Sequence, residues 1–315
     1  MCVTYSKDEF KNKCPMPESS NTFPTIEEIR ITVKGVEKLL ASTNPTKATG
    51  PDGIPPRILK ELAHELAPIL TVIFQKSLST GTVPSEWKTA LVSPIYKKGE
   101  HYNPANYRPV SLTSVPCKIL EHIIVSHIMD FLEDNNILVA SQHGFRKQRS
   151  CETQLLEFIS ELTTNTDQGK QTDVIVMDFA KAFDKVNHSL LVHKLEHYGI
   201  RNTINNWIAD FLDGRSQSVV VEGSRSNSIP VKSGVPQGSV LGPCLFLIYI
   251  NDLADCVSST ARLFADDTLL HRLVAAAIDH QTLQEDLRRL EIWEERWDMA
   301  FHPDKCSVLS VSKKK

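Results

Sequence analysis

The feature that most constrains this chain is a pair of adjacent carboxylates between two apolar segments, Asp266-Asp267. Residues 261–265 and 268–270 flank the pair and are typical of short strands, so the sequence predicts a β-hairpin with the carboxylates at its tip. Two carboxylates about 4 Å apart repel each other by roughly 4 kcal/mol at an effective dielectric constant near 20. A fold that packs them against apolar strands needs a cation there, or must protonate one of them. A solvated Asp-Asp turn is the alternative.

Composition excludes several classes of protein. The chain has 315 residues, of which 41% are hydrophobic and 23% charged, as expected for a globular protein of about two domains or one large domain with subdomains. The longest apolar run, residues 244–250, is far shorter than the roughly 20 residues of a membrane-spanning helix, and no signal-peptide pattern opens the chain. Seven cysteines without a CxxC pair indicate reduced intracellular thiols. The net charge of −3 argues against a protein that simply coats nucleic acid.

The first half of the chain is predicted to be mainly helical. After a loosely ordered lead-in at residues 1–24, Thr25-Ile26-Glu27-Glu28 has the pattern of a capping box and predicts a helix to about residue 42. Further helices are expected over residues 56–66, 68–79 (ending at Gly81), 118–134 and 151–168, with an extended segment over 87–96.

The second half alternates strands and helices. Residues 172–177 form a β-branched, apolar run typical of a buried strand, which ends at Asp178. Helices are expected over residues 189–198, 202–212, 241–257 (buried on all sides) and 275–299, a hairpin over 219–231 and a last strand over 307–311. This order predicts an α+β fold with antiparallel strands and helices packed on one face.

Three carboxylates are predicted to meet at one end of this sheet. Asp178 closes a buried strand, and Asp266-Asp267 lie at the tip of a hairpin about 90 residues later. Hard oxygen ligands of this kind suit Mg²⁺, and two such ions about 4 Å apart can promote phosphoryl transfer. Alternatively, Asp178 only caps the strand, or Asp184 takes its place.

Six segments resemble the motifs of reverse transcriptases and occur in the same order. The fingers motifs are matched by residues 106–112 (Asn-Tyr-Arg-Pro-Val-Ser-Leu) and 142–150 (Gln-His-Gly-Phe-Arg-Lys-Gln-Arg-Ser), and the four catalytic motifs by residues 178–186, 233–243, 264–267 and 302–306. Residues 50–54 (Gly-Pro-Asp-Gly-Ile) resemble the N-terminal extension of non-LTR retrotransposon (LINE, jockey-like) enzymes, although Thr49 stands where that family usually has proline. The resemblance covers about residues 45–310.

The resemblance implies the fingers and palm of a right-hand polymerase, with an antiparallel palm sheet packed on helices. The expected domains are an N-terminal helical extension (25–84), fingers (85–170) and a palm with finger insertions (171–315). The chain is expected to stop before the primer-gripping hairpin and thumb, and no endonuclease precedes it, as in a fragment or a truncated gene product.

The resemblance also assigns roles around the acidic pair. Asp178 and Asp266 hold two Mg²⁺ ions, for which Mn²⁺ can substitute, with Asp267 as their acidic neighbour and the Phe179 carbonyl also facing metal. Lys305 is a candidate for protonating the pyrophosphate leaving group, and a plain surface lysine is the alternative reading.

Other residues are assigned to substrates. Phe183 excludes a 2′-hydroxyl and so selects deoxynucleotides, a role compatible with a core phenylalanine. Gln237 and Gly238 approach the incoming nucleotide, Arg108 binds its triphosphate, and Lys97 or Lys98 assists. The basic residues Arg146, Lys147 and Arg149 contact the template backbone, although a solvated basic face is the alternative for each patch.

The implied function is that of an RNA-directed DNA polymerase, with an RNA template, a DNA primer and dNTPs as partners, no membrane and no evident obligate protein partner. The family's expected location is the nucleus. The absent thumb favours an alternative, a non-catalytic nucleic-acid-binding remnant. A metal-dependent phosphohydrolase would explain the carboxylates but neither the Ser-Gly-Val-Pro-Gln-Gly loop nor the fingers motifs.

Overall fold

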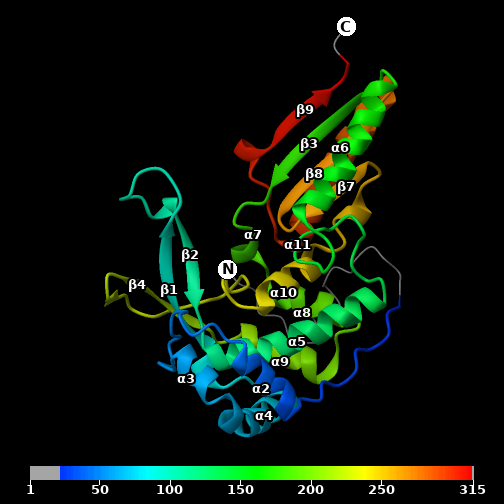
Figure 1. Cartoon of the computed structure of the whole chain (residues 1–315). Helices are drawn as coiled ribbons and strands as arrows, with labels where there is room; N and C mark the ends of the chain where they lie inside the picture. The colour runs from blue at the N-terminus through cyan, green and yellow to red at the C-terminus, as the bar shows by residue number, and fades with distance from the viewer. Residues whose placement is uncertain (1–21, 314–315) are drawn as a thin grey trace. The chain divides into compact units, whose positions relative to one another are not determined.

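The computed structural model describes residues 22–313 and divides them into two compact units. The first unit contains residues 136–197 and 246–313, and the second contains residues 23–135 and 198–245. Figure 1 shows that both units combine helices and strands, which confirms the predicted α+β class. The lead-in predicted at residues 1–24 lies almost entirely outside the described residues. No helix within residues 22–313 is long and apolar enough to cross a membrane.

The first unit is built on a four-stranded antiparallel sheet. Its strand order is β7 (Thr260–Phe264), β8 (Asp267–Val274), β3 (Gln171–Asp178) and β9 (Ser307–Val311). Strand β3 is buried on both faces over residues 172–175, as its β-branched run predicts. Helices α6 (Cys151–Asp167) and α11 (Ala277–Trp297) pack against this sheet (Figure 1).

A buried ion pair holds the helices of the first unit together. The ammonium of Lys194, on α8 (His188–His197), donates to Asp252 Oδ1 at 2.6 Å and lies 3.5 Å from the centre of the Trp297 ring. The same oxygen of Asp252 accepts from Trp293 Nε1 at 3.0 Å. Burial lowers the pKa of Lys194 to about 8, against the opposing attraction of Asp252. Because both charges are out of water, each depends on the other.

The second unit packs helices beside a mixed sheet. Its helices are α2 (Val33–Ala41), α3 (Pro56–Glu61), α4 (Ala63–Thr80), α5 (Val115–Asp134) and α9 (Asn202–Leu212). Its strands are β1 (Thr89–Tyr96), β2 (Tyr107–Leu112), β4 (Ser216–Val221), β5 (Ser224–Arg225) and β6 (Ile229–Pro230). The order is β2-β1-β4-β5, with β6 also on β4, and only the β1–β4 pair is parallel. The hairpin predicted over residues 219–231 is therefore present.

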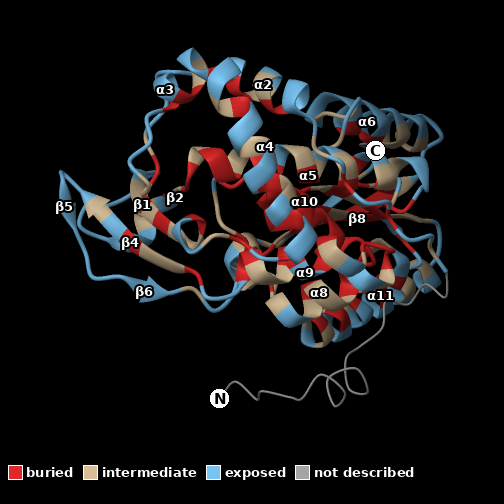
Figure 2. Ribbon diagram, turned by 90° about the horizontal axis from the view of Figure 1, so that it is seen from below, coloured by how far each residue is buried: buried red, intermediate tan, exposed pale blue. Residues whose placement is uncertain are grey.

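Helix α10 (Leu241–Ile250) carries the chain from the second unit into the first. It is buried along nearly its whole length (Figure 2), as its apolar sequence predicts. The helix ends at Ile250 rather than at residue 257, and the chain continues through a short 3₁₀ turn, Ala254–Cys256. The predicted helices 118–134, 151–168, 189–198, 202–212 and 275–299 and the strand 307–311 are found within three residues of their expected bounds.

The helix predicted to begin at Thr25 is wrong over its first turns. Helix α2 begins only at Val33, with Thr32 as its N-cap. The Ile26 N–H instead donates to the Gly199 carbonyl at 2.9 Å, and the Ile26 side chain is buried. Tertiary contacts thus replace the local capping box, because the segment gains both a backbone partner and apolar burial by staying extended.

The boundary between α3 and α4 also differs from the prediction. Pro68 was expected to open a helix but lies inside α4, where its ring leaves the His64 carbonyl without the usual helical donor. Gly81 ends α4 as predicted, in a left-handed conformation with φ of 64°.

We expect Lys194→Met to lower the free energy of unfolding by about 3–5 kcal/mol, because it leaves the Asp252 carboxylate buried without its counter-ion. Lys194→Met combined with Asp252→Asn should recover part of this loss. Chemical denaturation followed by circular dichroism measures both. Lys170→Met is the matched control, an exposed lysine of the same unit, and should cost less than about 0.5 kcal/mol. Equal losses at Lys194 and Lys170 would contradict the role of the ion pair.

Candidate active site

The acidic pair lies at the tip of a tight β-hairpin, as the sequence predicts. Phe264 on β7 pairs with Asp267 on β8, which leaves Ala265 and Asp266 as a two-residue loop. Ala265 has a φ of 54°, whereas Asp266 has a negative φ. A positive φ at the first position of a two-residue hairpin loop is a conformation that glycine normally supplies. The alanine therefore stores strain at the point that directs the carboxylates.

The register of the sheet places Asp178 directly opposite Asp267. The two residues form the last pair of the β3–β8 ladder, and Asp266 precedes Asp267 in the turn. Beyond this pair, the Asp178 carbonyl accepts from the His302 N–H at 2.7 Å. The strand end and the hairpin tip therefore bring the three predicted carboxylates to the same end of one sheet.

The backbone of Phe179 is oriented toward the hairpin side of β3. Phe179 forms an isolated antiparallel bridge with Phe301, flanked by hydrogen bonds from His302 N–H to Asp178 and from Ala180 N–H to Ala300. In such a pair, the residue between the two bonds points its own N–H and C=O away from the partner. The Phe179 carbonyl thus faces the side of β3 on which β8 lies, while its ring stacks on Phe301 at 4.3 Å.

Lys305 already supplies a cation to this cluster. Its ammonium donates to Asp178 Oδ2, and this hydrogen bond, together with the charges of the three carboxylates, raises the pKa of Lys305. The pKa of Asp267 is also raised, first because protein displaces water around its carboxyl group and then because Asp266 and Asp178 repel its charge, with Lys305 acting in the opposite direction. The cluster therefore favours bound positive charge.

The donor set fits a divalent cation by its chemistry. It combines three carboxylates and one backbone carbonyl, which are the hard oxygen ligands that Mg²⁺ prefers. Within residues 22–313, no three His, Cys, Asp or Glu side chains already converge to enclose a metal ion, and one carboxylate of this cluster, Asp178, is paired with Lys305.

The two aspartates at and after the end of β3, Asp178 and Asp184, differ in position. Asp184 lies on α7 (Ala182–Lys185) and is exposed, whereas Asp178 is the residue that pairs with the hairpin.

Phe183, on the same short helix, stacks on Phe246 with ring centres 4.5 Å apart, and the ring of Phe145 meets it edge-on at 6.4 Å. The Phe183 ring is therefore fixed in place by aromatic contacts.

A contact that sequence reasoning missed supports the hairpin. Gln142 is buried, and its Oε1 accepts from the N–H groups of Ala265 at 2.9 Å and Gly144 at 2.7 Å. The sequence marks this segment only by its resemblance to a fingers motif and by its basic residues. A glycine two residues after a glutamine is the only sequence signal of this close approach, and it is weak.

In the second unit, two of the predicted nucleotide-binding motifs lie side by side. The Ser111 N–H donates to the Gln237 carbonyl at 2.7 Å, and Arg108 lies exposed on β2 three residues before Ser111. Gly238 has a φ of 111°, and a Cβ there would meet the Ser111 carbonyl oxygen at 2.6 Å. Only glycine fits this contact. Lys97 and Lys98 are exposed in the connection from β1 to β2.

A second residue that the sequence did not reveal holds this loop. Glu121 on α5 is fully buried, and its Oε2 accepts from the N–H groups of Val240 at 2.7 Å and Leu241 at 3.0 Å. A carboxylate at these donors also interacts favourably with the N-terminal dipole of α10. Glu121 thereby fixes the end of the loop that carries Gln237 and Gly238.

The predicted template-contacting residues partly serve their own loop. Arg146 Nη1 donates to the Val139 and Gln142 carbonyls at 2.8 and 3.3 Å, and Arg149 Nη1 donates to the Ala140 carbonyl. Lys147 is exposed. The two guanidinium groups stabilise an irregular backbone, which leaves fewer of their donors for phosphate groups.

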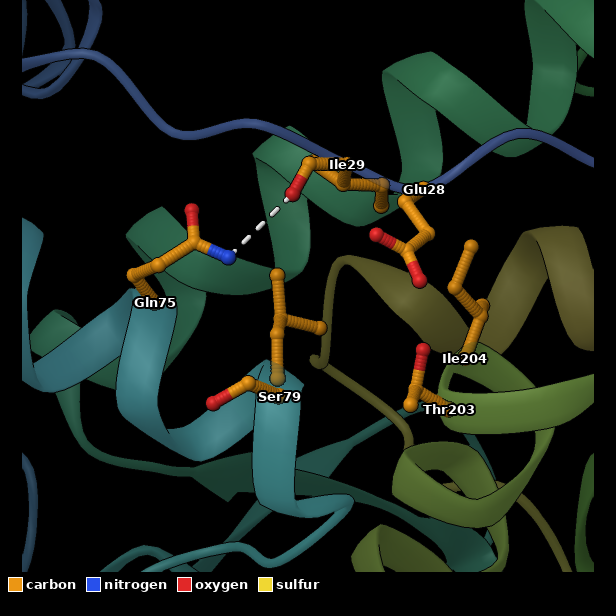
Figure 3. Close-up of a pocket in the computed structure, with 7 residues that line it drawn as sticks. Glu28, Ile29, Gln75, Ser79, Thr203 and Ile204 are labelled. Carbon is orange, nitrogen blue, oxygen red and sulfur yellow. Dashed lines mark hydrogen bonds between the residues drawn. The ribbon is translucent and has the colours of Figure 1, made fainter.

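A small pocket in the second unit contains none of the predicted site residues. It has a volume of about 100 Å³, and residues from the N-terminal segment, α4 and α9 line it (Figure 3). Gln75 Nε2 donates across it to the Ile29 carbonyl at 3.4 Å. The pocket lies where the extended N-terminal segment packs on α4 and α9.

Comparison with known proteins identifies the family. The sequence profile described as "Reverse transcriptase (RNA-dependent DNA polymerase)" matches residues 95–315. The chain is 28% identical over 292 residues to the RNA-directed DNA polymerase from mobile element jockey of Drosophila melanogaster, covering 90% of this chain and 32% of that protein. It is 29% identical over 291 residues to the probable RNA-directed DNA polymerase from transposon BS of the same species, covering 87% and 31%.

A polyprotein from a retrotransposable element of another species also matches the chain. The chain is 29% identical over 210 residues to the Pol polyprotein from the type-1 retrotransposable element R2 of Popillia japonica, covering 62% of this chain and 29% of that protein. The chain thus spans about a third of the length of the curated relatives that it matches. It belongs to the reverse transcriptase family, in the branch found in non-LTR retrotransposons.

Proposed function

We propose that this chain is the polymerase domain of an RNA-directed DNA polymerase, which adds dNTPs to a primer 3′-hydroxyl on an RNA template. Members of the family generally use divalent metal ions and act on template, primer and dNTPs. The observation that carries the proposal is the pairing of Asp178 with Asp267 across β3 and β8, with Asp266 in the adjoining turn. We propose the nucleus as the place of action, as for elements that prime on chromosomal DNA.

Asp178, Asp266 and the Phe179 carbonyl hold two Mg²⁺ ions in this proposal, with Asp267 as the adjacent acidic residue and Mn²⁺ as a substitute. Two such ions would supply activation of the attacking hydroxyl and stabilisation of the leaving oxygen. Lys305 has two tasks in turn in this proposal. Its ammonium balances the charge of Asp178 when the site holds no metal, and it donates a proton to the pyrophosphate as this group leaves.

The remaining residues bind the substrates. Arg108 binds the triphosphate with its planar guanidinium, aided by Lys97 or Lys98, and the loop at Gln237 and Gly238 faces the nucleotide. The close contact between this loop and β2, through Ser111, supports a shared task for these residues.

Two further contacts concern selectivity and the template. The Phe183 ring, held by Phe246, excludes the 2′-hydroxyl of a ribonucleotide. Lys147, with the remaining donors of Arg146 and Arg149, contacts the template backbone, where contacts add affinity without sequence choice.

Primer extension on an RNA template with Mg²⁺ tests the proposal. Asp266→Ala combined with Asp267→Ala should reduce extension by about 10³-fold or more, because a metal-holding carboxylate and its acidic neighbour are both lost. Asp184→Ala, an exposed aspartate outside the cluster, should retain activity. Binding of the template–primer without any extension by the wild-type chain would refute the proposal in favour of the alternative, a nucleic-acid-binding protein that has lost polymerisation.

Two variants separate the proton-donating role of Lys305 from the effect of its positive charge. Lys305→Met should slow single-turnover extension by about 10²-fold or more, as expected for loss of a general acid. Lys305→Arg keeps the positive charge beside Asp178 but transfers a proton poorly, so it should be as slow. Recovery of the rate in Lys305→Arg would show that only charge matters, and an unchanged rate in Lys305→Met would remove Lys305 from the mechanism.

Phe183→Val should admit ribonucleotides. We expect the preference for dNTPs over rNTPs to fall by about tenfold or more, a change that corresponds to about 1.4 kcal/mol of lost discrimination. Comparison of kcat/KM for dATP and ATP measures it, with Phe183→Tyr as the control that keeps the ring. An unchanged preference for dNTPs over rNTPs would leave Phe183 with a packing role in the core alone.

A further inference from the structure

We propose that Gln142 is the positioning residue of the acidic hairpin, which holds Ala265 in its left-handed conformation and so fixes the directions of Asp266 and Asp267. Its consequence for catalysis rests on the proposed polymerase function, whereas its effect on the hairpin does not. The hairpin tip places an alanine with a positive φ next to two carboxylates that repel each other.

The amide group of Gln142 contacts both polar groups of the Ala265 backbone. Its Oε1 accepts from the Ala265 N–H at 2.9 Å, and its Nε2 approaches the Ala265 carbonyl oxygen at 3.4 Å. Gln142 is 2% exposed and Ala265 is 5% exposed. Because no water reaches these groups easily, the Ala265 N–H depends on Gln142 for its hydrogen bond.

The backbone around Gln142 is fixed to the hairpin as well. The Leu263 N–H donates to the Ser141 carbonyl at 3.0 Å, and the His143 N–H donates to the Leu263 carbonyl at 2.8 Å. These two bonds form a parallel bridge between Gln142 and Leu263 on β7. The side chain therefore reaches Ala265 from a rigid base rather than from a flexible loop.

Gly144 makes this approach sterically feasible. A Cβ at Gly144 would lie 2.3 Å from the Ala265 nitrogen, closer than any two unbonded atoms of this kind can come. The Gly144 N–H also donates to Gln142 Oε1 at 2.7 Å, so the same oxygen is held by donors on both sides of the contact.

Glutamine is the side chain that suits this position. It presents one acceptor and one donor to the two sides of a single residue. A glutamate would keep the acceptor but lose the donor, and it would add a negative charge beside Asp266 and Asp267. An alanine would leave a buried N–H without a partner and a left-handed residue without support.

Hydrogen–deuterium exchange of the metal-free chain in EDTA tests the effect on the hairpin. Gln142→Ala should lower the protection of the Ala265 amide by about tenfold, the loss expected when one buried hydrogen bond is removed. Gln154→Ala is the matched control, because Gln154 is a buried glutamine of the same unit on α6, and it should leave the hairpin unchanged. Equal protection of the hairpin in wild type and Gln142→Ala would overturn the proposal.

The dependence of primer extension on Mg²⁺ tests the consequence for catalysis. Gln142→Ala should raise the half-saturating Mg²⁺ concentration by about tenfold while the thermal unfolding midpoint follows that of Gln154→Ala. Adding Ala265→Gly to Gln142→Ala should restore much of the affinity, because glycine adopts the left-handed conformation without strain. Absence of this rescue would overturn the positioning role. Failure of the wild-type chain to extend a primer would instead refute the polymerase function, and exchange would still decide the role of Gln142.

Discussion

The pairing of Asp178 with Asp267 across two strands is the constraint on which the first unit depends. Strand β3 ends at Asp178 and β8 begins at Asp267, and a shift of one residue in register would turn either side chain to the other face of the sheet. Both strands also carry apolar residues into the core, so burial fixes the register that chemistry requires. Hydrophobic packing thus holds like charges together, and Lys305 offsets their repulsion.

The elements that the sequence predicts best are those whose signals are local and repeated. The strand ending at Asp178 follows from an unbroken β-branched run, and α5 follows from apolar residues at helical spacing. The acidic hairpin follows from two short apolar runs around a polar pair. In each case the local pattern and the final packing require the same conformation, which is why the family resemblance and the observed fold agree.

The features that escaped prediction depend on residues far apart in the sequence. Thr25 has a good capping pattern, yet Ile26 pairs with Gly199 and the helix starts later. Gln142 contacts a residue 123 positions away, and Glu121 contacts one 119 positions away. Polar side chains of this kind have no period or spacing that marks them, and only the fold shows which backbone groups they satisfy.

Strand β9 has a consequence for handling the protein. It forms one edge of the sheet in the described chain, and Val308 and Leu309 on it are 66% and 53% exposed. An open edge with apolar side chains and no charged residue between Ser307 and Val311 can template pairing with another molecule. Solubility at high concentration, rather than the stability of the fold, is then the property that this strand limits, and a single lysine placed on it is the simplest remedy.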